Sequence, residues 1–261
     1  MLVAIDAGNT NVVFAIFEGE TLRAKWRASS DAKRTADEYA VWLTQLMTLQ
    51  NLKPADITGA IIANVVPAAS FNLTTLCSEF FKVTPLVIGD PKVELGIEVR
   101  MDHPENVGAD RLVNALAAHR AYGGPLIVID FGTATTFDIV GPDGAYEGGV
   151  ICPSAQHSVE ALYRAAAQLP RVKIERPDQV IGKDTVPAMK SGIYWGYVSL
   201  IEGLTARVKE EYGQPMKVIA TGGLATLYAE ATPAIEQVDS DLTLRGLRQI
   251  HAANCPTSSG D

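Results

Sequence analysis

The chain has 261 residues, of which 47% are hydrophobic and 20% are charged, and its formal net charge is -8 at pH 7. These values are typical of a folded globular protein and exclude a disordered or fibrous one, and a chain of this length can form one large or two moderate domains. The negative charge argues against a general binder of nucleic acids or membrane surfaces, because their phosphates would be repelled by an acidic protein.

No apolar run approaches the ~20 residues that a membrane-spanning helix needs. The N-terminus enters a predicted strand at once, without the basic region and cleavage site of a secretory signal. We therefore expect a cytoplasmic protein that does not bind membranes. The cysteines, Cys77, Cys152 and Cys255, have neither metal-ligand nor C-x-x-C spacing and indicate unpaired thiols.

The first half of the chain predicts three strands followed by alternating helices and strands. The strands are aliphatic or alternate between apolar and polar residues, and a capping box at Thr35 and Glu38 begins the first helix. In chain order, the predicted elements are strands at 2–5, 12–17 and 21–28, a helix after 35–38, a strand at 57–66, a helix at 67–81 and a strand at 85–88. The order is βββαβαβ.

The second half repeats this pattern after residues 89–107, which are rich in charge and proline and predict a connecting segment. A strand followed by a hairpin is predicted over 126–151. Gly192, Gly196 and Gly203 interrupt the longest predicted helix and indicate close helix packing, within the subunit or across a dimer. The other predicted elements are helices after 108–111 and at 158–168, 185–212, 224–230 and 241–251, and a strand at 217–220.

One short motif occurs twice, each time at the end of a predicted buried strand. Asp6 is followed by Gly8 near the start of the chain, and Asp130 is followed by Gly132 in the second half. A carboxylate in this position is costly unless cations or hydrogen-bond donors meet it, and glycine lets the backbone approach a ligand closely. A single Asp-x-Gly can be ordinary turn chemistry. Two copies in the same hairpin context indicate an internal duplication.

Residues near the second motif are suited to phosphate. Thr133, Thr135 and Thr136 supply hydroxyl and amide donors, and the Thr-Gly-Gly loop at 221–223 lies between a predicted strand and helix, where nucleotides often bind. These loops and the two acids indicate a cleft between the halves that holds nucleotide phosphates and metal, and hence phosphoryl transfer. The sequence has neither a G-x-x-x-x-G-K-[ST] loop nor the protein-kinase motifs, which excludes those architectures.

Asp110 and Arg111 begin the helix after the connecting segment, where an acid often only compensates the helix dipole and the arginine can be a solvated neighbour. Together with the other motifs, however, the sequence resembles type III pantothenate kinases, in order and across nearly the whole chain. The segments that carry the resemblance are Asp-Ala-Gly-Asn-Thr-Asn at 6–11, Gly-Ala-Asp-Arg at 108–111, Asp-Phe-Gly-Thr-Ala-Thr at 130–135, Gly-Gly at 148–149, Gly-Lys-Asp-Thr at 182–185 and Thr-Gly-Gly at 221–223.

The resemblance implies an α/β fold of duplicated ribonuclease H-like domains, as in the actin, sugar kinase and Hsp70 group, with a ligand cleft between the halves. We place the N-terminal half at 1–107 and the C-terminal half at 108–261. The implied enzyme is a phosphotransferase with an alcohol group as acceptor. It would use ATP to phosphorylate pantothenate to 4'-phosphopantothenate, the first step of coenzyme A biosynthesis. Mg2+ would accompany ATP, and the protein would be a homodimer with shared active sites.

The resemblance also implies roles for individual residues. Asp110 would be the general base, and Arg111 would pair with the pantothenate carboxylate. Asp130 would bind a monovalent cation, K+ or NH4+, and Thr185 would reach pantothenate from the other subunit. The residues implied to bind ATP are Asp6, Ala7, Gly8, Asn9, Thr10, Asn11, Val12, Val13 and Thr133. The residues implied to bind pantothenate are Met101, Gly108, Ala109, Asp110, Arg111 and Thr185.

The sequence departs from the family pattern in two places. Met101 stands where the family usually has a tyrosine near pantothenate, and methionine offers apolar contact but no hydroxyl. Pro153 is followed by Ser154 instead of glycine, which would make a left-handed backbone costly there, and the loop continues with the less common residues 155–157. These changes concern substrate affinity more than the reaction, because every charged position is retained.

Two other functions remain open from the sequence. Another small-molecule kinase of the same superfamily, or a phosphatase of the polyphosphate type, would use similar loops. A non-catalytic, nucleotide-binding regulatory member would be expected to lack Asp110 or Asp130. Both residues are present, which favours an enzyme.

Overall fold

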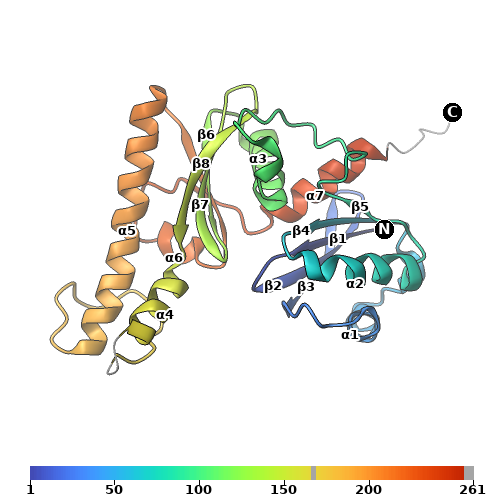
Figure 1. The fold of residues 1–261 in the computed structure, drawn as a ribbon, viewed down its shortest axis with the longest axis horizontal. Coiled ribbons are helices and arrows are strands. Elements are labelled where there is room, and N and C mark those ends of the chain that lie inside the picture. The colour runs from blue at the N-terminus through green and yellow to red at the C-terminus, as the bar shows by residue number, and fades with distance from the viewer. Residues whose placement is uncertain (166–168, 256–261) are drawn as a thin grey trace. The chain divides into compact units, whose positions relative to one another are not determined.

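The computed structural model describes residues 1–165 and 169–255, which form two compact units (Figure 1). Among the described residues, unit 1 comprises 1–97, 102–117 and 241–255, and unit 2 comprises 98–101 and the rest of 118–240. Each unit contains one five-stranded sheet with helices packed on it. No helix in the described part of the chain combines the length and the apolar character that crossing a membrane requires.

The sheet of unit 1 has the strand order β3-β2-β1-β4-β5. The first three strands form two antiparallel hairpins, whereas β4 and β5 run parallel to β1. β1 and β4 lie at the centre and are almost entirely buried, as their aliphatic sequences predict. The strands are β1 (Leu2–Ala7), β2 (Asn11–Glu18), β3 (Thr21–Ser29), β4 (Gly59–Asn64) and β5 (Leu86–Val87).

Helices cover both faces of this sheet. The predicted capping box begins α1: Thr35 Oγ1 accepts a hydrogen bond from the Glu38 amide at 3.3 Å, and the Glu38 carboxylate accepts one from the Thr35 amide at 2.7 Å. α1 and α2 pack on one face, and α7 with the first turns of α3 packs on the other. The helices are α1 (Ala36–Leu49), α2 (Ser70–Thr75) with a π-helical turn after it (Leu76–Phe80), α3 (Ala109–Tyr122) and α7 (Leu242–Asn254), and short 3-10 turns lie at Pro54–Asp56, Pro67–Ala69 and Pro104–Asn106.

The sheet of unit 2 repeats that of unit 1. Its strand order, β8-β7-β6-β9-β10, places two antiparallel hairpins beside two parallel strands in the same sequence of connections. The long helix α5 packs on this sheet through buried Tyr194, Tyr197, Val198 and Ile201 (Figure 1). The elements are β6 (Leu126–Phe131), β7 (Ala134–Val140), β8 (Tyr146–Pro153), α4 (Ala155–Ala165), α5 (Thr185–Tyr212), β9 (Lys217–Gly222), α6 (Ala225–Ala229) and β10 (Gln237–Val238).

The repeated topology confirms the predicted duplication. Asp6 is the fifth of the six residues of β1, and Asp130 is the fifth of the six residues of β6. Each strand is central in its sheet, with an antiparallel neighbour on one side and a parallel neighbour on the other. The two acids therefore occupy equivalent places in equivalent sheets.

The compact units differ from the halves expected at 1–107 and 108–261. Helix α7, at the C-terminal end of the described chain, packs on the sheet of unit 1 through Leu244, Leu247 and Ile250. A Cβ on Gly246 would lie 2.6 Å from the Val113 carbonyl oxygen of α3, so the two helices meet at a residue that must stay small. The two halves of the sequence correspond to the duplication, whereas the two compact units are defined by these contacts.

Two other features differ from the sequence prediction. Helix α4 begins at Ala155 instead of 158, and its predicted end at 168 lies outside the described residues. Strand β10 was not predicted. A Cβ on Gly192 or Gly196 would meet no atom within 4 Å, so packing within the subunit does not explain these glycines.

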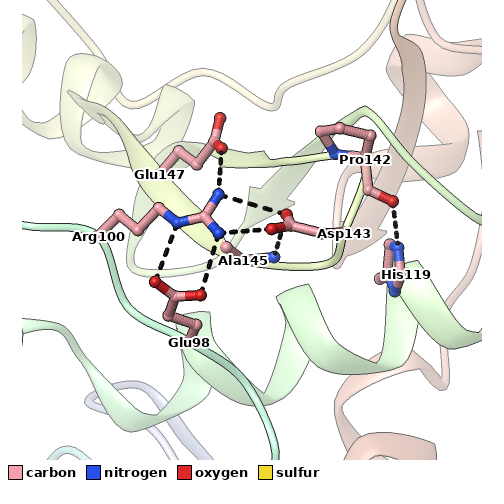
Figure 2. A network of polar contacts seen from close by, with 7 residues as sticks. All are labelled: Glu98, Arg100, His119, Pro142, Asp143, Ala145 and Glu147. Atoms are coloured by element: carbon pink, nitrogen blue, oxygen red, sulfur yellow. Dashed lines mark hydrogen bonds and ion pairs between the residues drawn. The ribbon is translucent and has the colours of Figure 1, made fainter.

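Arg100 links the segment 98–101 to a hairpin of unit 2 (Figure 2). The backbone of this segment pairs with the start of β8. The Arg100 guanidinium contacts the carboxylates of Glu98, Asp143 and Glu147 at nitrogen–oxygen distances of 3.0, 2.5 and 3.1 Å. The hydrogen bond from Arg100 lowers the pKa of Asp143 below its ordinary value. This network holds four residues of the connecting segment against a hairpin of unit 2.

Candidate active site

The first predicted loop lies at the end of the central strand of unit 1. Asp6 is partly buried, and its Cα lies opposite Val13 and Ala63 of the neighbouring strands. The turn after β1 is closed by a hydrogen bond from the Gly8 amide to the Asn11 carbonyl oxygen at 2.9 Å. The loop between these residues is exposed, so its backbone donors can meet a ligand.

Ser30 also fixes this loop, and the sequence did not reveal it. Its hydroxyl donates to the Gly8 carbonyl oxygen at 2.7 Å, and its amide donates to the Thr10 carbonyl oxygen at 2.9 Å. Ser30 directly follows β3, so the end of the third strand supports the loop after the first. A single serine after a strand is too common a signal to have indicated this role.

Asp110 lies in the first turn of α3. Its Oδ1 accepts a hydrogen bond from the Arg111 amide at 2.9 Å, so the carboxylate does compensate the helix N-terminus. A Cβ on Gly108 would lie 2.7 Å from the same oxygen. The carboxylate therefore lies over Gly108, and a larger residue there would require the carboxylate to shift.

Asp6 and Asp110 interact electrostatically within unit 1. The pKa of Asp6 is raised to about 7, mainly by burial and further by the negative charge of Asp110, while Arg27 acts in the opposite direction. Burial also raises the pKa of Asp110, against the effect of the hydrogen bond from the Arg111 amide. Two neighbouring acids with raised pKa values form a place that favours a proton or a cation.

Asp130 occupies the equivalent place in unit 2. Its Cα lies opposite Thr136 and Thr221 of the neighbouring strands. Asp130 Oδ1 and the Phe131 carbonyl oxygen both lie 2.6 Å from the point that a Cβ on Gly222 would occupy, and Gly222 has a φ of +90°. Glycine at this position keeps open a space at which two oxygen atoms converge.

The remaining predicted residues lie on separate elements of unit 2. Thr133 is in the turn between β6 and β7. Thr185 is the exposed first residue of α5, and its amide donates to the capping carboxylate of Asp184 at 2.7 Å. Met101 is 37% exposed, with its Sδ 3.6 Å from the point that a Cβ on Gly148 would occupy. Asp130 and Thr133 therefore share one hairpin, while Thr185 and Met101 lie elsewhere in the unit.

Ser154 does not carry the strain expected from the loss of glycine. Among the described residues, only Asn51 and Lys82 are non-glycine residues with a positive φ. Ser154 instead caps α4, because its Oγ accepts a hydrogen bond from the His157 amide at 3.2 Å. This cap explains why the helix begins earlier than its apolar pattern predicts.

A shallow cavity of about 680 Å³ lies along α4. One of its arginines, Arg171, pairs with Glu160 at 3.0 Å. The cavity includes two residues at which the sequence departs from the family pattern, and none of those predicted to bind ATP or pantothenate. Its lining residues are Gln156, His157, Glu160, Ala161, Arg164 and Arg171.

The two units define the class of protein, an α/β protein with duplicated ribonuclease H-like domains. The fold is similar to a solved structure from Sinorhizobium meliloti, provisionally named as a 2-dehydro-3-deoxygalactonokinase, with a TM-score of 0.64, 16% identity and coverage of 100% of this chain and 99% of that one. It is also similar to the ethanolamine utilization protein EutJ from Carboxydothermus hydrogenoformans, with a TM-score of 0.51, 17% identity and coverage of 94% and 88%. These likenesses confirm the fold class.

Sequence comparison identifies the family within this class. A family model described as type III pantothenate kinase matches residues 2–207. The chain is 64% identical to the type III pantothenate kinase of Paramagnetospirillum magneticum, over 97% of this chain and 98% of that protein. It is 62% identical to that of Rhodospirillum rubrum, over 98% and 100%. The chain belongs to the type III pantothenate kinase family.

The reaction of this enzyme is the ATP-dependent phosphorylation of pantothenate, the first step of coenzyme A biosynthesis. The family match confirms the predicted function over the alternatives of another small-molecule kinase and a regulatory protein.

The raised pKa of Asp6 predicts that Asp6→Asn stabilises the protein at high pH. The folded state holds this proton more tightly than the unfolded chain, so wild-type stability falls as the pH rises from 3.8, the ordinary pKa, to about 7. Asparagine has no proton to lose. At pH 8, without ATP or metal, we expect the free energy of unfolding to rise by on the order of 1–2 kcal/mol, since Asp6 is only partly buried.

Urea unfolding at pH 8 and pH 5 measures this effect. The gain should be smaller at pH 5, where more of Asp6 is protonated in the folded state. Asp178→Asn, which changes an exposed acid of unit 2, is the control. An equal gain for Asp6→Asn at both pH values would contradict the explanation.

Proposed function

We propose that Asp110 is the general base of this pantothenate kinase. The observation that carries the proposal is the place of its carboxylate, which is partly buried at the start of α3 and electrostatically coupled to Asp6. A carboxylate with a raised pKa is a stronger proton acceptor than an ordinary carboxylate. Arg111 would pair with the carboxylate of pantothenate, because a guanidinium can donate two parallel hydrogen bonds to it.

The proposed step transfers one proton and one phosphoryl group. The primary hydroxyl of pantothenate gives its proton to Asp110, and its oxygen forms a bond to the γ-phosphorus of ATP. The bond from that phosphorus to the bridging oxygen breaks, and ADP leaves with the electron pair. Such a reaction depends on the alignment of the two substrates and on cations near the transferred group.

The residues from Asp6 to Val13 would bind the phosphates of ATP, and Mg2+ would accompany them. The residues fit this cation, because a divalent charge near Asp6 would offset the repulsion from Asp110 and carboxylate oxygens are ligands that Mg2+ prefers. Within residues 1–165 and 169–255, no three His, Cys, Asp or Glu side chains gather as a metal site. Most ligands of Mg2+ would then be phosphate oxygens and water, and the ion would neutralise charge on the phosphates.

Asp130 would bind a monovalent cation, and Thr133 would bind the nucleotide. The convergence of Asp130 Oδ1 and the Phe131 carbonyl oxygen at Gly222 supports this assignment, since both are oxygen atoms with negative or partial negative charge. K+ or NH4+ bound at Asp130 would offset the negative charge of this carboxylate and of ATP. The alternative is a carboxylate that only accepts hydrogen bonds from nearby backbone amides.

The protein would act as a homodimer. The exposed face of α5 carries Gly192 and Gly196, at which added side chains would meet nothing in the same subunit. Large apolar residues are also exposed in unit 2: Ile151 and Val180 at 63% and Ile181 at 73%. Apolar side chains and small residues on a helix face suit a two-fold interface, in which the same surface of each subunit is buried.

Each active site would be shared between the two subunits. Met101, Gly108 and Ala109 would contact pantothenate from one subunit, and Thr185 would contact it from the other. Thr185 is exposed at the start of α5, next to the apolar residues of the proposed interface, which supports this arrangement. A cytoplasmic location stays a prediction from the sequence.

Replacement of the base tests the first proposal. Asp110→Asn should lower kcat by about 10²–10⁴-fold, because asparagine cannot accept the proton, while ATP still binds. Coupled detection of ADP measures the rate, and calorimetry measures ATP binding. Asp102→Asn, an exposed acid in the same connecting region, should leave both unchanged. Activity of Asp110→Asn near the wild-type rate would rule out this base.

Cation exchange tests the role of Asp130. Wild-type activity in a sodium-exchanged sample should rise when K+ or NH4+ is added, and Asp130→Asn should lose this activation. Gly222→Ala should lose it as well, because a methyl group would lie 2.6 Å from Asp130 Oδ1. A wild-type rate that is the same in Na+ and K+ would favour a carboxylate that only binds backbone amides.

Mixing of two inactive variants tests the shared site. Asp110→Asn and a nearly inactive Thr185 variant are dissociated and reassociated in equal amounts. About half of the dimers are then mixed, and each mixed dimer holds one intact and one doubly damaged site, so roughly a quarter of wild-type activity should return. If both residues serve a site within one chain, no activity returns. Failure of recovery, with mixed dimers shown to have formed, would refute the shared site and leave the base assignment standing.

A further inference from the structure

A cluster of stacked aromatic rings lies beside the hairpin that carries Thr133. The Tyr228 ring of α6 stacks on Phe131, the last residue of β6, with centroids 5.2 Å apart. The same ring stacks on Tyr197 of α5, with centroids 5.8 Å apart and an interplanar angle of 24°. All three side chains are buried. The cluster joins the end of the central strand to the long helix.

The hydroxyl of Tyr197 connects three further elements. It donates a hydrogen bond to the carbonyl oxygen of Pro153 at the end of β8. Burial raises the pKa of Tyr197, and hydrogen bonding to the side chains of Ser158 in α4 and Thr135 in β7 acts in the opposite direction. The hydroxyl of Tyr228, in contrast, is buried without a hydrogen-bond partner among the described residues. Of the two stacked tyrosines, Tyr197 therefore has a hydrogen-bond partner for its hydroxyl, and Tyr228 has none among the described residues.

The contacts of Tyr197 enclose the turn between β6 and β7. Phe131 and Thr135 are directly opposite each other in the hairpin, and both side chains are buried. Tyr197 holds Thr135 through its hydroxyl and Phe131 through the ring of Tyr228. Thr135 thus contacts Tyr197 directly, and Phe131 is linked to Tyr197 by the ring of Tyr228.

The equivalent turn of unit 1 is also fixed by a hydroxyl from outside its hairpin. There, Ser30 donates to the Gly8 carbonyl oxygen and directly supports the backbone of the loop. In unit 2, Tyr197 of helix α5 takes the role that Ser30, directly after strand β3, has in unit 1. The two halves of the duplication support equivalent turns by different means.

We propose that Tyr197 is a positioning residue for ATP, whose hydroxyl holds the β6–β7 turn so that Thr133 meets the nucleotide. The inference rests on the proposed assignment of Thr133 to the nucleotide. Loss of the hydroxyl leaves the buried Thr135 hydroxyl and the Pro153 carbonyl oxygen short of a partner, while the stacked rings remain. The turn then samples positions in which Thr133 does not reach ATP, and the nucleotide binds more weakly.

Tyr197→Phe tests this inference, with Tyr228→Phe as the matched control. The first substitution should raise the KM for ATP, and the Kd of ATP measured by calorimetry, by about 5–10-fold, the equivalent of one buried hydrogen bond. The KM for pantothenate should stay within about twofold of wild type, and so should kcat. Tyr228→Phe removes a hydroxyl that has no partner from the same stack, so all these constants should stay unchanged.

The inference is overturned if Tyr197→Phe leaves ATP binding unchanged, if it raises both KM values equally, or if Tyr228→Phe has the same effect. Thr135→Val removes the other partner of one hydrogen bond and should also weaken ATP binding. If Tyr197→Phe does not fold, Thr135→Val decides by the same criteria.

Thr133→Ala in the same assays distinguishes a failure of the nucleotide assignment from a failure of the positioning role. If Thr133→Ala leaves ATP binding unchanged, the nucleotide assignment itself fails. If Thr133→Ala weakens binding and Tyr197→Phe does not, only the positioning role fails.

Discussion

The burial of two neighbouring carboxylates, Asp6 and Asp110, is the constraint on which the site of unit 1 depends. The fold holds both residues in place: Asp6 lies in β1 after residues 3–5, which are fully buried, and the Asp110 carboxylate accepts a hydrogen bond in the first turn of α3. Their negative charges repel each other, and a proton or a cation beside them offsets that repulsion.

The duplication gives the two halves the same framework and different chemistry. Asp6 and Asp130 share one register in equivalent sheets, yet Asp6 faces another acid, while Asp130 lies beside a glycine that opens a space. The difference comes from the residues around the shared strand end and not from the strand itself. The repeated fold thus provides two equivalent strand ends, and the side chains around each strand end decide what it can bind.

Much of the fold could be predicted from the sequence because its signals are local. Buried strands and the capping box at Thr35 need only neighbouring residues to be recognised. The start of α4 could not be predicted, because the Ser154 cap depends on where β8 ends, and the short strand β10 exists only beside its parallel neighbour. Ser30 and Tyr197 act on residues distant in the sequence, so no pattern shows them. Asp110 was ambiguous as a first-turn acid and was singled out only by the family resemblance.

The return of α7 to unit 1 has a consequence for the synthesis of the protein on the ribosome. The five strands of unit 1 are complete once residue 87 has been made, but the apolar face under Leu244, Leu247 and Ile250 stays open until α7 ends at Asn254. Unit 2 is complete before that point, so the half that is translated first is the last to close. Translation that stops within the last few dozen codons would release a chain with a folded second unit and an exposed, aggregation-prone face on the first.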